Sequence, residues 1–126
     1  MKYKTFFVSA LLASSLTFGS TVFAASPAVR EMAGILSHLN HYPSDSEKRS
    51  LSGIVKNAKA NRAERLIAEA MMQMHHHVNA ADRERLEAIA KDRGVDEDTR
   101  HLAGILASTN HHPNQGDVAT LRDMMK

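Results

Sequence analysis

The chain has 126 residues, with 16 Lys and Arg, 14 Asp and Glu, eight His and no Cys. The lack of cysteine excludes disulfides, thiolate metal sites and cysteine nucleophiles. Two of the basic residues, Lys2 and Lys4, precede the part expected to fold, which then has 14 basic and 14 acidic residues. This formal neutrality gives no support to nucleic-acid or anionic-membrane binding.

The first 24 residues have the pattern of a cleavable signal peptide. Lys2 and Lys4 are followed by an apolar run over residues 6–18, and Val22 and Ala24 stand at the two positions that a signal peptidase reads. The run is too short to span a bilayer, and no second apolar stretch reaches spanning length. The sequence therefore predicts export to the bacterial periplasm, cleavage after Ala24, and a domain of residues 25–126 without a membrane span.

The rest of the chain repeats itself with a period of 35 residues, in units of about 26–60, 61–95 and 96–126. Each unit is too short to bury its apolar side chains alone, so neighbouring units must stack around one core. The columns of identical residues are Arg30, Arg65 and Arg100; Ala33, Ala68 and Ala103; His41, His76 and His111; and Leu51, Leu86 and Leu121.

Each unit is expected to form two helices. The first starts after an N-cap and runs about four turns to the histidine, and the second starts after another N-cap with an acid three residues later. The expected N-caps are Ser26, Asn61 and Asp96 for the first helices, and Ser44, Asn79 and Asn114 for the second. The expected buried stripes of the first helices are Met32, Ile35, Leu36 and Leu39; Ile67, Ala70, Met71 and Met74; and Leu102, Ile105, Leu106 and Thr109.

The fold class that follows is all-α, with three tandem 35-residue helix-turn-helix repeats forming a six-helix array or short solenoid. The repeat pattern leaves open whether the array is an open solenoid or a closed bundle.

The histidine column, His41, His76 and His111, has two interpretations. Three equivalent imidazoles suggest a metal site, but packed helices lie about 8–10 Å apart, whereas a metal holds nitrogen ligands at about 2.0–2.1 Å. Laddered histidines in a solenoid therefore could not meet at one ion, although a closed bundle could bring two together. The interpretation favoured here is a residue at the helix C-terminus whose ring bonds a free carbonyl.

A local cluster offers a second candidate metal site. His75, His76 and His77, with Met72 upstream, resemble a set of ligands for copper or zinc. Covalent haem attachment of the c type is impossible without cysteine, although other haem binding stays open. His38 and His41 form a further weak pair at helical spacing.

The arginine column, Arg30, Arg65 and Arg100, lies 11 residues before the histidine column, about three helical turns away. Both columns are then expected on one edge of the array, where they could receive an acidic partner. The simpler alternative for the arginines is solvated ion pairing with nearby acids, which are Glu31, Glu64 and Asp98.

No serine elbow, phosphate-binding loop, zincin helix or paired-carboxylate motif is present, so we expect no catalytic residues and no enzyme activity. The leading hypothesis is a non-enzymatic periplasmic protein that binds an envelope protein or peptide through the arginine and histidine columns. The alternative is a periplasmic copper-, zinc- or haem-binding protein that uses the His75–His77 segment and Met72. The leading hypothesis needs no cofactor.

Overall fold

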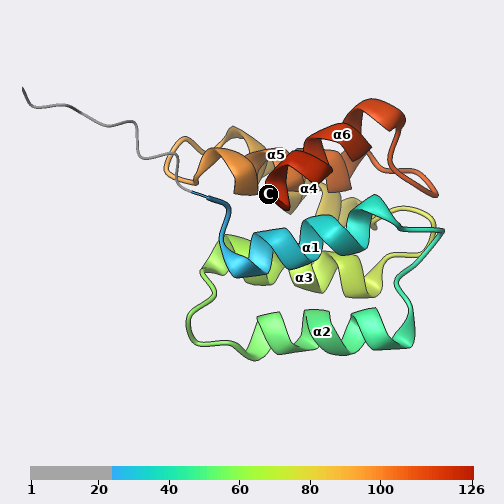
Figure 1. Ribbon diagram of the computed structural model, residues 1–126, viewed down its shortest axis with the longest axis horizontal. Helices are drawn as coiled ribbons and strands as arrows, with labels where there is room; N and C mark the ends of the chain where they lie inside the picture. The colour runs from blue at the N-terminus through green and yellow to red at the C-terminus, as the bar shows by residue number, and fades with distance from the viewer. Residues whose placement is uncertain (1–23) are drawn as a thin grey trace, which may run out of the picture.

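The computed structural model describes residues 24–126, so the predicted signal peptide lies outside the described residues except for Ala24. Within this range the chain forms six α-helices and no strand, which confirms the all-α prediction (Figure 1). The helices are α1 (Pro27–Ser37), α2 (Asp45–Lys56), α3 (Arg62–Gln73), α4 (Ala80–Lys91), α5 (Glu97–Ser108) and α6 (Gln115–Met124).

All six helices begin where the N-cap pattern predicts. In each, the N-cap side chain accepts a hydrogen bond from the backbone N–H three residues later. Ser44 forms a complete capping box with Glu47, and Asn61 forms one with Glu64. Each cap satisfies an N–H that the helix itself leaves unpaired, so local sequence fixes these boundaries.

The first helix of each repeat ends earlier than predicted. α1, α3 and α5 end three or four residues before the histidine, which therefore lies on a connecting turn and not on the helix. The next apolar positions, Leu39, Met74 and Thr109, are still at most 5% exposed, because the chain turns them inward over the end of the core. Burial at these positions is why the apolar stripe suggested a longer helix.

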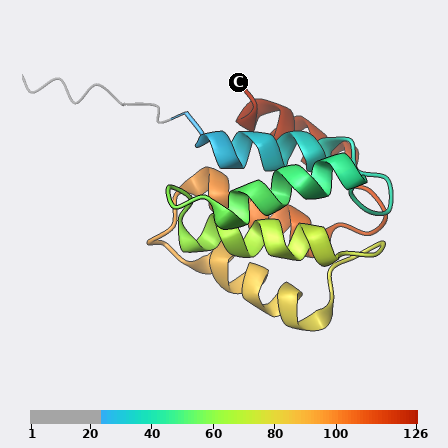
Figure 2. The same cartoon turned by 90° about the horizontal axis from the view of Figure 1, so that it is seen from below.

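The contacts between helices close the six into a ring with approximate threefold symmetry. Figures 1 and 2 both show α6, the last helix, beside α1, the first. α1, α3 and α5 run in the same direction and contact one another at the centre. Each second helix packs mainly on the first helix of the following repeat: α2 on α3, α4 on α5, and α6 back on α1. The contact between α6 and α1 closes the array, so the six-helix array is a closed one and not an open solenoid.

The predicted apolar stripes form one shared core. Leu51, Leu86 and Leu121, the repeated leucine of the second helices, are at most 1% exposed. Where α6 meets α1, a Cβ on Gly34 would lie 3.3 Å from the Met125 sulfur, a tight contact that a small shift of the flexible methionine side chain would relieve. None of the helices in residues 24–126 is both long and apolar enough to cross a bilayer.

Candidate metal centre

The histidine column lies on three equivalent and unusual turns. His41, His76 and His111 have φ values of 71°, 64° and 65°. Among the residues that the structure describes, no other has a positive φ, and this includes the glycines. In each turn the N–H after the histidine donates to the carbonyl before it, at 2.7–2.9 Å. This one-residue γ-turn with positive φ is rare and strained.

The three turns are joined by their backbones. The His41 N–H donates to the His111 carbonyl at 2.8 Å, the His111 N–H to the His76 carbonyl at 2.6 Å, and the His76 N–H to the His41 carbonyl at 2.9 Å. These bonds form a closed ring between residues 35 and 70 positions apart in the sequence. The ring fixes the three histidines around the symmetry axis at the C-terminal ends of α1, α3 and α5.

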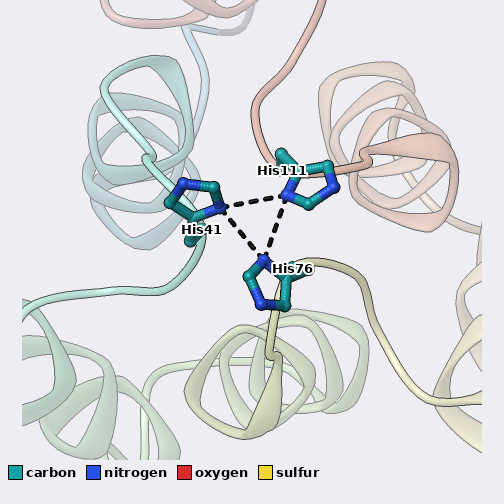
Figure 3. A group of neighbouring side chains, drawn as sticks. All are labelled: His41, His76 and His111. Atoms are coloured by element: carbon teal, nitrogen blue, oxygen red, sulfur yellow. Dashed lines mark hydrogen bonds between the residues drawn. The ribbon is translucent and has the colours of Figure 1, made fainter.

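The three imidazoles point their Nδ1 atoms at one another (Figure 3). Every pair of Nδ1 atoms among His41, His76 and His111 is 3.0 Å apart. The rings meet edge to face, with centroids 4.7–5.0 Å apart. His41 is half-buried, whereas His76 and His111 are exposed, so solvent reaches the cluster.

Hydrogen bonds within the triangle cannot satisfy all three nitrogens. The Nδ1 of a neutral imidazole carries either a proton or a lone pair, so it cannot donate to one neighbour and accept from the other. One protonated Nδ1 could share its proton with two lone pairs, but those two lone pairs would still face each other. A cation at the axis would accept all three lone pairs at once.

The nitrogen spacing fits a transition-metal ion. Ligands about 2.0–2.1 Å from an ion are about 3.3–3.4 Å apart at tetrahedral angles and about 2.9–3.0 Å apart at right angles. The observed 3.0 Å is close to both values and nearest to one face of an octahedron. The centre of a triangle with 3.0 Å sides is about 1.7 Å from each corner, so an ion at bonding distance stands out of the nitrogen plane.

The surroundings of His76 favour the neutral form of its ring. Desolvation among the packed side chains lowers the pKa of His76, and positive charge on His111, His41, His75 and His77 would lower it further. A lowered pKa keeps this imidazole in the form with a free lone pair, which is the form that binds metal.

The meeting of all three histidines differs from the expectation that at most two could approach. That expectation took the helix spacing as the ligand spacing. The histidines lie beyond the helix ends, on turns that bend towards the axis, so the distance between helix axes does not limit them. The interpretation of these histidines as helix-end residues is also wrong, because each Nδ1 of the column faces two other Nδ1 atoms and no carbonyl.

The structure divides the predicted His75–His77 and Met72 set. Only His76 belongs to a group of three candidate ligands, and that group is the histidine triad of His41, His76 and His111. The His75 ring packs near Tyr42, at 6.4 Å between centroids, while the His77 Nδ1 donates to the Val78 carbonyl at 2.9 Å. Met72 packs against the hydrophobic core. Neighbouring residues of a tight turn point different ways, so adjacency in sequence does not gather their side chains.

His38, the other candidate partner of His41, bonds elsewhere. Its Nδ1 lies 2.9 Å from the Gly34 carbonyl, which it can reach as a donor at the end of α1. His38 thus takes the helix-end role that the sequence suggested for His41.

The arginine column lies at the opposite end of the inner helices. Arg65 is near the start of α3, and its guanidinium donates to the carbonyls of Asn57 and Ala58, just after α2, at 3.2 and 3.4 Å. Among the described residues, no ion pair joins Arg30, Arg65 or Arg100 to an acid. Because the contact of α6 with α1 closes the array, the arginines and histidines lie at opposite ends of the inner helices and not along one edge of an open array.

No protein-family model, no curated protein and no solved structure matches this chain. Fold and site together define its class as a closed ring of three helix-turn-helix repeats that carries a three-histidine cluster on its axis. Function therefore has to be inferred from the chemistry of that cluster.

Proposed function

We propose that the protein binds one transition-metal ion through the Nδ1 atoms of His41, His76 and His111. The observation that carries this proposal is the 3.0 Å separation between every pair of these atoms, which come from three different repeats. A non-glycine residue at positive φ costs on the order of 1–3 kcal/mol, and the structure has one in each turn. An ion that accepts three lone pairs offsets both this strain and the mutual repulsion of the nitrogens.

The ligand set favours particular metals. Three imidazoles without a carboxylate or thiolate suit Zn²⁺, Cu²⁺, Ni²⁺ and related ions, whereas Ca²⁺ and Mg²⁺ prefer oxygen ligands. Haem iron already has four ligands from its macrocycle, so three converging nitrogens suit a bare ion better. We therefore favour copper or zinc over haem, with one ion per chain.

Export is part of the proposal. The basic start and apolar run that precede the domain support secretion to the periplasm, where the triad would bind its ion without cysteine ligands. Binding of an envelope protein or peptide through the two repeated columns stays a prediction. The separation of the arginines from the histidines gives it no geometric support.

Calorimetric titration of the protein, purified without a histidine tag, tests the proposal. We expect one Zn²⁺ or Cu²⁺ per chain with a Kd below about 1 μM, or about −8.2 kcal/mol. His76→Asn should abolish this binding while keeping the turn, because Asn tolerates positive φ better than most residues.

His75→Asn is the matched control, because Asn40 and Asn110 occupy the equivalent positions of the other repeats. This variant should bind metal as the wild type does. Loss of binding in His75→Asn, or tight binding that survives His76→Asn, would contradict the assignment of the ligands.

A further inference from the structure

We infer that an ion bound by the triad keeps at least one coordination position facing solvent and holds a small anionic ligand there. This inference rests on the proposed function and adds a second ligand to it. The ligand class is that of hydroxide, azide and small carboxylates, each of which donates one lone pair to the metal.

The geometry leaves part of the ion uncovered. Because the nitrogen triangle is too small to hold the ion in its plane, all three protein ligands lie on one side of the metal. Among the described residues, no further His, Asp or Glu joins the three histidines as a candidate ligand. His76 and His111 are exposed, so water and small solutes reach the cluster.

The charge of the centre favours an anion over a neutral ligand. All three protein ligands are neutral, so a divalent ion keeps its full charge. Along the chain, no acid lies within two residues of any triad histidine. In zinc sites with an open position, this uncompensated charge lowers the pKa of a bound water to about 7, which makes hydroxide the default anion.

A second copy of the chain is the competing occupant. Nitrogens near right angles leave one face of an octahedron open, and the triad of another molecule could fill that face. Such a complex would be a metal-linked dimer without room for an anion.

Spectroscopy of the Co²⁺-loaded full chain tests the inference. Co²⁺ accepts the same imidazole ligands, and its visible bands report on every change of coordination. We expect azide to shift these bands saturably and reversibly, and an equal ionic strength of perchlorate, a poor ligand, to leave them unchanged. The His75→Asn variant should behave as the wild type does.

Three results would count against the inference. Cobalt bands that azide leaves unchanged in a monomer would overturn it while leaving ion binding intact. A cobalt-dependent dimer, detected by light scattering and resistant to azide, would overturn it because a second copy then fills the open face. No saturable cobalt spectrum at all would remove the proposed function, and the inference with it.

Discussion

The N-terminal and C-terminal ends of the inner helices α1, α3 and α5 differ in the residues that occupy equivalent positions of the three repeats. At the N-terminal end, the equivalent buried positions hold three different residues, Val29, Glu64 and Thr99. Their polar atoms have partners: Glu64 accepts from Ser26 Oγ at 2.8 Å and from the Asn61 N–H at 3.1 Å, and Thr99 Oγ1 donates to Asp96. At the C-terminal end, all three repeats place a histidine on a strained turn, and the rings face one another.

This difference separates what the fold needs from what the site needs. Apolar, acidic and hydroxyl side chains all serve at the N-terminal end, so packing there accepts any residue whose polar atoms are satisfied. Packing does not require histidine at the C-terminal end either, because Gly or Asn adopts positive φ at lower cost. The proposed metal ion would explain why all three repeats carry an imidazole at a position where positive φ is costly.

Truncating a core side chain should lower the free energy of unfolding more than the other changes predicted here, and it should leave metal binding intact. Leu86→Ala should lower the free energy of unfolding by about 2–5 kcal/mol, since Leu86 is 1% exposed at the centre of the chain. Denaturant unfolding measures this loss. The folded fraction should still bind one ion, and a loss below about 1 kcal/mol would contradict the shared core.

Metal should stabilise the folded protein by binding to the three histidines at the C-terminal ends of the inner helices. At a free-ion concentration of about 100 times Kd, the folded state gains about 2.7 kcal/mol, which raises Tm by roughly 10 °C or more for a domain of this size. Thermal unfolding with and without a chelator measures the gain. His111→Asn should remove it, and an equal gain in that variant would mean that the ion binds elsewhere.

Breaking the N-terminal end should leave metal binding alone. Glu64→Ala removes the Asn61 capping box and the bond from Ser26, which should cost about 1–2 kcal/mol of stability. Calorimetry should give the wild-type affinity for the ion. A large loss of affinity would show that the two ends are coupled and that the comparison between them is too simple.

Glycine at the centre of a strained turn should separate stability from binding. His76→Gly relieves positive φ, so the metal-free variant should be as stable as the wild type or about 1 kcal/mol more stable. The same variant should lose tight metal binding. Destabilisation comparable to that of Leu86→Ala would indicate that the imidazole is a packing residue.

Acid should weaken the metal-free fold slightly. The pKa of His76 is lower in the folded protein than in the unfolded chain, so the unfolded chain binds more protons as the pH falls through the ordinary imidazole value. This contribution to stability is present above that value and is lost as the pH falls through the lower pKa of the folded state. Chelator-treated protein unfolded at a series of pH values should show this trend, which His76→Asn should reduce.

Much of this structure could be predicted from sequence because it depends on local or periodic signals. The N-caps Ser44, Asn79 and Asn114 fix helix starts through bonds within one turn, and the repeat period fixes equivalent core positions. The same repeat singled out His41, His76 and His111 as one column, but it could not show where the column converges.

That convergence depends on long-range facts. The chain must leave α1, α3 and α5 before the histidine, adopt positive φ there, and close α6 onto α1. Helical periodicity contains none of these events. The alternative metal site, His75–His77, was suggested by adjacency in sequence, but His75 and His77 point to different partners.

X-ray absorption spectroscopy of the zinc-loaded protein tests the central claim most directly, because the outer-shell scattering of imidazole rings counts the bound histidines. We expect three imidazole nitrogens at about 2.0–2.1 Å, no sulfur, and one or more light atoms from solvent. The same spectrum should be obtained for a variant carrying His75→Asn and His77→Tyr, the residues found at those positions in the first repeat. Fewer than three imidazoles, a sulfur ligand from Met72, or a changed spectrum in the variant would contradict a centre formed by His41, His76 and His111.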